Sequence, residues 1–175
     1  MSDKPLNIRI IPSVFTLLNL FFGFLAIVWT LDSMYKLAAG MILLSALMDS
    51  MDGKVARKLS VSSDFGKELD SLSDLVSFGV APAILTYKVF LVSHLGYWGI
   101  ILAAAFALCG AVRLARFNVL NISTYFVGVP ITFAGGFMAL MLLFHGIIPW
   151  FIYPVSMLVF SFLMVSTFKV AKLGK

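Results

Sequence analysis

The sequence predicts an all-α, polytopic membrane protein: a bundle of six transmembrane helices with both termini in the cytoplasm. Three observations predict this class. Of the 175 residues, 61% are hydrophobic and only 12% are charged. Soluble domains contain about 45–50% apolar and about 25% charged residues, so both fractions differ from those of a soluble protein. The second observation is the mean hydropathy of the whole chain, which is +1.04. The third observation is a series of apolar runs long enough to cross a bilayer.

Each of these runs is a candidate membrane span, because a helix needs about 20 apolar residues to cross the hydrocarbon layer. The predicted spans are 12–31, 36–57, 66–90, 95–116, 126–145 and 148–168. We interpret the first as a retained helix rather than a signal peptide, because it has no small-residue cleavage site. The length is that of one domain, so we expect 1–175 to form a single transmembrane domain.

Basic residues are distributed unevenly between the two ends of these spans. With the N-terminus inside, the outer side receives only Lys36 and Lys88 of the 13 Lys and Arg residues. The inner side receives Lys4, Arg9, Lys54, Arg57, Lys58, Lys67, Arg113, Arg116, Lys169, Lys172 and Lys175. The positive-inside rule therefore predicts a multi-pass protein of the cell membrane with both termini in the cytoplasm. Trp29, Trp98 and Trp150 fall near the outer boundary, as in an aromatic belt.

Four aspartates interrupt the apolar pattern at the inner ends of the second and third spans. Asp49 and Asp52 are three residues apart and Asp70 and Asp74 are four apart, so each pair shares one face of its helix. Carboxylates at a bilayer edge are costly and repel one another unless a cation compensates them. Two helices with two carboxylates each predict an oxygen-ligand site for a hard divalent cation. The alternative is pairing with nearby lysines and arginines in a solvated loop.

The spacing around these aspartates resembles a family signature. The stretch reads Asp49-x2-Asp52-Gly53-x2-Ala56-Arg57-x8-Gly66-x3-Asp70-x3-Asp74. It is similar at every fixed position to D-x2-D-G-x2-A-R-x8-G-x3-D-x3-D of the CDP-alcohol phosphotransferases. Members of that family carry the signature across their second and third transmembrane helices on the cytoplasmic side, so the resemblance covers most of the chain. It implies transfer of a lipid phosphoryl group from a CDP-lipid to an alcohol.

The resemblance also implies roles for the aspartates. Asp49, Asp52 and Asp70 would hold Mg²⁺ or Mn²⁺, which neutralises charge on the pyrophosphate. Asp74 would be the general base that takes the proton from the attacking hydroxyl. Its place one turn deeper than Asp70, toward the apolar half of the helix, sets it apart from the other three.

A second group of residues is predicted to bind the nucleotide: Gly53, Ala56, Arg57 and Gly66 of the signature, with Thr16 and Asn19 of the first span. The small side chains allow a nucleotide to lie close to the backbone. Arg57 either contacts phosphate or is an ordinary inner-side charge. Thr16 and Asn19 either line the nucleotide pocket or form hydrogen bonds between helices.

Other stretches resemble the serine-using group of this family, the membrane phosphatidylserine synthases. They are IPSVFTLLNLFFGFLAI at 11–27, LDSLSDLVSFGVAPA at 69–83, RLARFN at 113–118 and YFVGVPIT at 125–132. This resemblance implies transfer of the phosphatidyl group from CDP-diacylglycerol to the hydroxyl of L-serine, giving phosphatidylserine and CMP. Arg113, Arg116 and Asn118 are the predicted acceptor-binding residues, because arginine can bind the serine carboxylate through two hydrogen bonds. Alternatively, both arginines are interfacial anchors.

Several alternatives stay open from the sequence. The acceptor could be glycerol 3-phosphate or an inositol phosphate, although two arginines are few for a phosphorylated substrate. The donor could carry ether-linked archaeal tails, which leave little trace in such a sequence. The acids could also line the path of a cation transporter, but transport needs acids across the membrane depth, and the outer half has only Asp32. By resemblance we expect a homodimer, with membrane lipid and no nucleic acid as partners.

Overall fold

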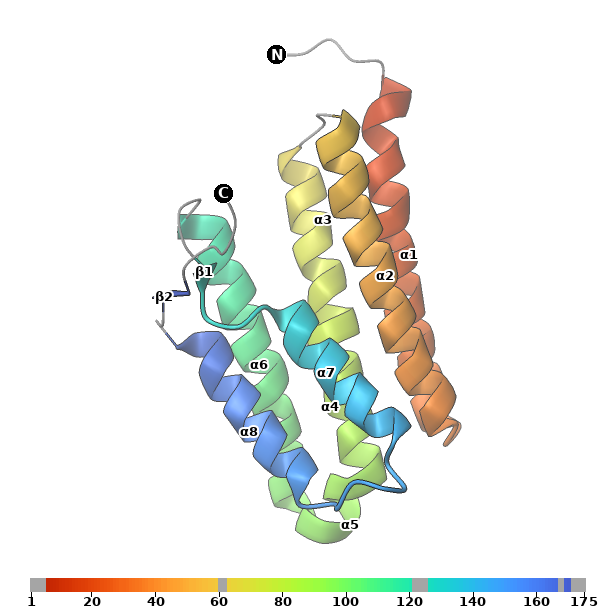
Figure 1. Ribbon diagram of the computed structural model, residues 1–175, viewed down its shortest axis with the longest axis vertical. Coiled ribbons are helices and arrows are strands. Elements are labelled where there is room, and N and C mark those ends of the chain that lie inside the picture. The colour runs from red at the N-terminus through yellow and green to blue at the C-terminus, as the bar shows by residue number, and fades with distance from the viewer. Residues whose placement is uncertain (1–5, 60–62, 121–125, 167–168, 171–175) are drawn as a thin grey trace.

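The computed structural model is a helical bundle in which the chain runs up and down through six helical segments (Figure 1). It describes residues 6–59, 63–120, 126–166 and 169–170. Lys4, Lys172 and Lys175, which the topology prediction used, lie outside the described residues. Helices account for nearly all of the described chain, so the predicted all-α class is confirmed.

Helices α1 (Leu6–Leu31) and α2 (Tyr35–Leu59) form a long antiparallel pair along one side of the bundle. A tight turn joins them, in which Ser33 has a positive φ of 62°. Ala38 and Ala39 are fully buried on α2, and their small side chains allow helices to pack closely. Both helices match predicted spans, although α1 begins six residues earlier than the apolar run indicated.

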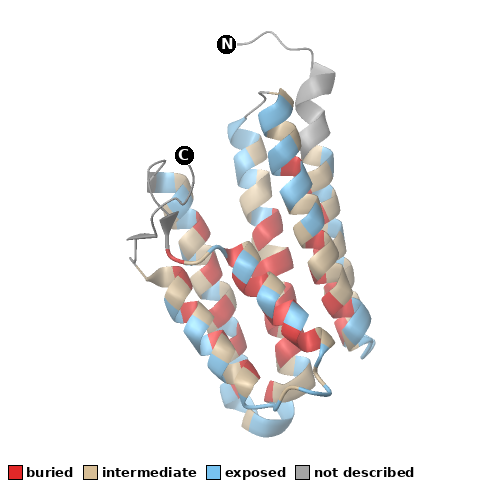
Figure 2. Cartoon of the chain, in the orientation of Figure 1, coloured by how far each residue is buried: buried red, intermediate tan, exposed pale blue. Residues whose placement is uncertain are grey.

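The third segment is one continuous helical rod at the centre of the bundle. It consists of α3 (Asp64–Asp74), the π-helix η1 (Leu75–Val80), α4 (Ala81–Thr86), the π-helix η2 (Tyr87–Leu91) and α5 (Val92–Leu95). Half of its apolar window is buried, against 28% and 22% in α1 and α6 (Figure 2). The sequence predicted a helix here but not the wider π turns, the first of which follows directly after Asp74.

The last three helices are α6 (Tyr97–Leu120), α7 (Ile131–Leu143) and α8 (Ile152–Val165). The prediction that the fifth span begins at 126 is wrong, because residues 126–130 are not helical. Gly128 there has a φ of 71°, and Pro130 lies just before the first helical residue. A proline suits a helix start, since it has no N–H to leave unpaired.

Two short strands close this end of the bundle. Strand β1 (Phe126–Val127) pairs antiparallel with β2 (Lys169–Val170). A Cβ on Gly128 would lie 2.7 Å from the carbonyl oxygens of Leu163 and Met164. The absent side chain therefore allows this turn to pack directly on the C-terminal end of α8.

Glycines bring two helices into close contact with η1. A Cβ on Gly23 of α1 would overlap with Oγ of Ser77, and one on Gly135 of α7 would overlap with the carbonyl oxygen of Phe78. Phe78 itself is fully buried. Helices α1 and α7 therefore pack closely against the π-helix η1 through these glycines. This packing fixes the position of the helical segment that directly follows Asp74.

Length and composition of the helices fit a multi-pass membrane protein. Within the described residues, three stretches are long and apolar enough to cross a membrane: Ser13–Leu31, Asp64–Leu95 and Tyr97–Val119. Helices α7 and α8 are apolar but shorter, with 13 and 14 residues. The N-terminal end of α1 and the C-terminal ends of α2, α6 and α8 all point toward one end of the bundle (Figure 1).

Candidate active site

The four aspartates lie where α2 and α3 face each other. Helix α3 is capped by Ser63, whose Oγ accepts the N–H of Gly66 at 3.0 Å. A Cβ on Gly66 would lie only 3.0 Å from that oxygen, so a glycine suits this cap. The cap fixes where α3 begins and thereby which face carries Asp70 and Asp74.

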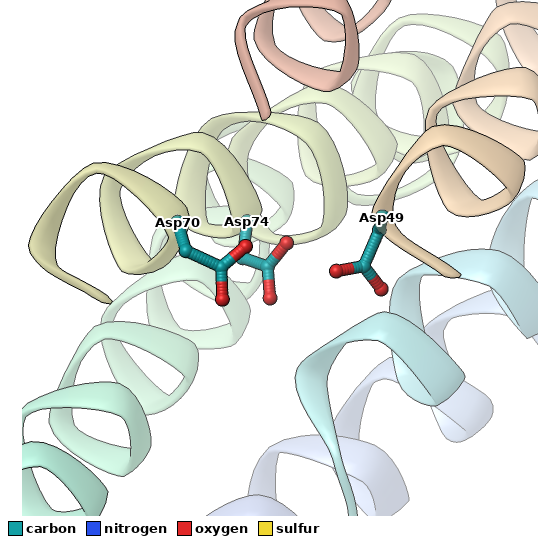
Figure 3. A group of neighbouring side chains, drawn as sticks. All are labelled: Asp49, Asp70 and Asp74. Carbon is teal, nitrogen blue, oxygen red and sulfur yellow. The ribbon is translucent and has the colours of Figure 1, made fainter. Parts of the chain in front are cut away.

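Three of the carboxylates converge on one point. Asp49, Asp70 and Asp74 each offer one oxygen, and these oxygens lie within 4.8 Å of one another. Figure 3 shows Asp70 and Asp74 extending from α3 toward Asp49 on α2. Asp52 is buried nearby but lies outside this group of three. Its assignment as a metal ligand, and that of Asp74 as a base, stay predictions.

Helix α1 supplies one hydrogen-bond donor to each aspartate helix. Thr16 Oγ1 donates to Oδ2 of Asp52 at 3.0 Å, and Asn19 Nδ2 donates to Oδ1 of Asp74 at 3.1 Å. Both donors are buried. Hydrogen bonding between helices, one of the two alternatives for Thr16 and Asn19, is therefore observed, while their nucleotide contact stays a prediction.

The remaining two aspartates differ in their partners. The carboxylate of Asp49 lies beside the side chain of Thr132, the second residue of α7. Oδ1 of Asp70 is buried and has no hydrogen-bond partner. A buried carboxylate oxygen without a donor is unfavourable unless something else compensates its charge.

Electrostatics favour a cation at this point. Asp49, Asp52 and Asp70 all repel the charge of Asp74, and within the described residues none of these four carboxylates forms an ion pair with a basic side chain. Hard cations such as Mg²⁺ and Mn²⁺ prefer carboxylate oxygens. The converging oxygens and the unpartnered atom of Asp70 therefore fit a divalent metal.

A cavity of about 370 Å³ opens beside the aspartates, between α3, α6 and the start of α7. Its lining includes acidic, basic and uncharged polar side chains: Asp64, Lys67, Glu68, Asp70, Ser71, Asp74, Arg113, Asn118 and Thr132. Asp70 and Asp74 thus belong both to the carboxylate cluster and to the cavity wall. A substrate in this cavity would lie directly against the two aspartates of α3.

The three predicted acceptor-binding residues are placed differently. Arg113 and Asn118 line the cavity. Nε of Arg113 is buried without a hydrogen-bond partner, and its charge attracts that of Asp74. Arg116 instead donates from Nη2 to the carbonyl oxygen of Val165 at 2.7 Å, and so caps the end of α8.

The predicted nucleotide-binding residues of α2 lie on its last turns. Gly53 is exposed, and a Cβ there would meet nothing within 4 Å. Ala56 is half-buried, and Arg57 is exposed with Nε bonded to the carbonyl oxygen of Gly53 at 3.0 Å. Open space beside Gly53 is compatible with a bound nucleotide, but the role of these residues stays a prediction.

Sequence reasoning missed several polar residues around the site. Asn118 donates to Oγ of Ser71 at 3.0 Å and to the carboxylate of Glu68 at 3.4 and 3.5 Å. Ser71 is three residues from both Glu68 and Asp74 on α3, and this helical spacing is the signal that could have found it. Thr132 on α7 had no such signal, because its proximity to Asp49 depends on how α7 packs against α2.

A comparison with known families identifies the chain. The model of the CDP-alcohol phosphatidyltransferase family matches residues 9–167. The chain belongs to this family. The resemblance in the aspartate signature is thereby confirmed, and the four aspartates of this CDP-alcohol phosphatidyltransferase lie within the matched region.

Curated relatives are similar over most of the chain. A CDP-diacylglycerol–serine O-phosphatidyltransferase of Methanocaldococcus jannaschii is 52% identical over 116 residues, 66% of this chain and 52% of that relative. The archaetidylserine synthase of Methanothermobacter thermautotrophicus is 42% identical over 138 residues, 77% of this chain and 58% of the relative. A CDP-diacylglycerol–serine O-phosphatidyltransferase of Bacillus subtilis is 43% identical over 126 residues, 71% of each. The chain thus spans little more than half the length of the two archaeal relatives.

Proposed function

We propose that this CDP-alcohol phosphatidyltransferase transfers the phosphatidyl group of CDP-diacylglycerol to the hydroxyl of L-serine, giving phosphatidylserine and CMP. The observation that carries the proposal is the position of Asp74. Its carboxylate belongs to the aspartate cluster and also lines the polar cavity. The names of the relatives, two of which are serine phosphatidyltransferases, support serine as the acceptor.

In this mechanism Asp74 is the general base. It takes the proton of the serine hydroxyl as the serine oxygen bonds to the lipid-side phosphorus. The bond between that phosphorus and the bridging oxygen of the pyrophosphate breaks, and CMP leaves with this oxygen. Asn19 donates a hydrogen bond from Nδ2 to Oδ1 of the Asp74 carboxylate at 3.1 Å.

Asp49, Asp52 and Asp70 would hold the divalent metal, Mg²⁺ or Mn²⁺. When bound, the metal supplies positive charge to the phosphate oxygens on which negative charge develops. The unpartnered Oδ1 of Asp70 supports this assignment for one of the three. The proposed nucleotide contacts are Gly53, Ala56, Arg57 and Gly66 around the last turns of α2 and the start of α3.

The cavity has charges that suit a zwitterionic amino acid. Arg113 can bind a carboxylate, and its buried Nε lacks a partner. Glu68 of α3, which accepts a hydrogen bond from Asn118, can also accept one from the ammonium group of the amino acid. A phosphorylated acceptor such as glycerol 3-phosphate or an inositol phosphate would meet Asp64 and Glu68 as well as Arg113 and Lys67, so it fits less well.

A second candidate differs only in the donor. The relative named archaetidylserine synthase favours an ether-linked CDP-lipid. We also propose that the protein lies in the cell membrane with the aspartates on the cytoplasmic side, as the excess of basic residues at that end supports. A homodimer stays a prediction from the family resemblance.

The test is CMP release by the purified protein in liposomes with Mn²⁺ or Mg²⁺. CDP-diacylglycerol and its ether-linked counterpart are each offered with serine, glycerol 3-phosphate, inositol phosphate or no acceptor. Of the acceptors offered, we expect only serine to support CMP release. This release should be lost when EDTA removes the metal. Release with another acceptor would overturn serine while keeping the family chemistry. A cation transporter would release no CMP in any arm.

A further inference from the structure

Asn19 lies where α1 meets both aspartate helices. Its side chain is fully buried, and Nδ2 donates to Oδ1 of Asp74 at 3.1 Å. Its main-chain carbonyl oxygen accepts hydrogen bonds from Oγ of Ser45 on α2 at 3.1 Å and Oγ of Ser77 on η1 at 3.0 Å. One residue of α1 is therefore bonded to α2, to the last residue of α3 and to the π-helix that follows.

Gly23 makes this arrangement possible. It lies one turn after Asn19 on α1, and a Cβ at this position would overlap with Oγ of Ser77. Without a side chain there, the Ser77 hydroxyl reaches the Asn19 carbonyl oxygen. The backbone of Asn19 is thus held by Ser45 on α2 and by Ser77 on η1. The start of its side chain is therefore fixed relative to Asp74.

The bond to Asp74 has a defined direction. If the amide were turned over, its oxygen would face the Asp74 carboxylate, and two acceptors would oppose each other. Asp74 is also repelled by the other three carboxylates, which act to turn it away from the cluster. A hydrogen bond to an ionised carboxylate is among the stronger ones in proteins, so Asn19 opposes that rotation.

We propose that Asn19 is a positioning residue: it holds the Asp74 carboxylate so that its free oxygen faces the cavity, where the acceptor hydroxyl binds. The inference rests on the proposed function, because it assumes Asp74 to be the base. It differs from the predicted nucleotide contact of Asn19, since the side chain is buried and already engaged with Asp74. Loss of Asn19 should therefore reduce turnover rather than donor binding.

The test compares Asn19→Leu with Thr30→Val. Leucine has the same number of side-chain heavy atoms as asparagine and the same branch point, but no donor. Thr30 is a matched control, because it is also fully buried on α1 and its hydroxyl bonds only within the helix, to the carbonyl oxygen of Ala26 at 2.7 Å. The readouts are kcat and KM for CDP-diacylglycerol and for serine in liposomes with Mn²⁺, and the melting temperature in detergent.

We expect Asn19→Leu to lower kcat by about 10- to 100-fold, as for residues that orient catalytic groups. KM for CDP-diacylglycerol should stay within about threefold of wild type, and the melting temperature should change no more than in Thr30→Val. Asn19→Gln, which keeps an amide donor, should recover part of the lost kcat. If Asn19→Leu does not fold, Asn19→Ala serves in its place with the same expected split.

Other results would overturn the positioning role. A kcat within about threefold of wild type would do so, as would a raised KM for the donor at unchanged kcat, which would favour the nucleotide contact. Failure of both apolar variants to fold would make Asn19 purely structural. Wild-type protein that releases no CMP would instead remove the proposed function, and the positioning role with it.

Discussion

The two sides of the aspartate site are built differently. On the side of α1, Thr16 and Asn19 are buried and donate to Asp52 and Asp74 at 3.0 and 3.1 Å. On the side of α6, an open cavity is lined by charged groups, and Asn118 reaches Glu68 only at 3.4 and 3.5 Å. On the α1 side the donors that bond the aspartates are buried, whereas on the α6 side charged groups line an open cavity.

This difference separates two requirements of the proposed reaction. A base has to keep one orientation through every turnover, and buried hydrogen bonds provide that. An acceptor has to enter and leave, and an open cavity permits it. Changes on the α1 side should therefore alter turnover, and changes on the α6 side should alter the concentration of serine required.

The largest effect is expected at the residue that both sides share. Asp74→Asn keeps the size of the side chain but removes the base, so kcat should fall by about 10²- to 10⁴-fold. Metal-dependent binding of CDP-diacylglycerol should persist, because the other three aspartates remain. The measurement pairs CMP release with donor binding to the same liposomes. Full activity in this variant would show that Asp74 is not the base.

A smaller effect is expected on the open side. Arg113→Gln removes the cavity guanidinium and should raise KM for serine by about 10- to 100-fold, the worth of a charged hydrogen bond of about 1.5–3 kcal/mol. Arg116→Gln should raise it less, because Arg116 bonds to the end of α8. Serine titrations of the two variants check this order. The reverse order would assign the acceptor carboxylate to Arg116.

The smallest effect on activity is expected from the packing behind the site. Gly135→Ala places a methyl group against the carbonyl oxygen of Phe78, so it should destabilise the fold by about 1–3 kcal/mol. Gly136→Ala is its matched control, since a Cβ there meets nothing within 4 Å. Thermal unfolding in detergent compares them. Equal melting temperatures would show that α7 does not press on η1 as closely as described.

Much of the fold followed from apolar length and charge. Six helical segments and the meeting of α2 and α3 at their aspartates were predictable, because membrane spans are long and the signature spacing is helical. The start of α7 was not predictable, since Gly128 and Pro130 lie within an otherwise apolar run. They prevent a helix directly before Ile131 through the φ of Gly128 and the proline ring, which hydropathy does not record. The π-helical turns of η1 also leave no mark in hydropathy.

Part of the site depended on packing between helices. Asp49, Asp70 and Asp74 converge, whereas Asp52 turns to Thr16, and this choice is set by how α1 lies against α2. Asn19 was recognised as a candidate, but its bond to Asp74 joins residues 55 positions apart. Spacing along one helix predicts shared faces, but it does not predict which neighbour a face will meet.

The shortness of α7 would change the level of a surrounding membrane beside the site. Its second residue, Thr132, lies beside Asp49, so α7 begins at the depth of the aspartates. Helix α2 continues from Asp49 to Leu59, about 15 Å further at 1.5 Å per residue. The 13 residues of α7 extend about 20 Å, less than the hydrocarbon thickness of about 30 Å.

A bilayer that meets so short an apolar helix becomes thinner there. Headgroups next to α7 would then sit lower than those next to α1 and α2, at the depth of the carboxylates. A lipid-linked pyrophosphate can therefore approach the aspartates while its tails stay in their own leaflet. Under the proposed function, the step between the long and short helices would bring the membrane surface down to the aspartates, so the lipid substrate would not have to leave the bilayer.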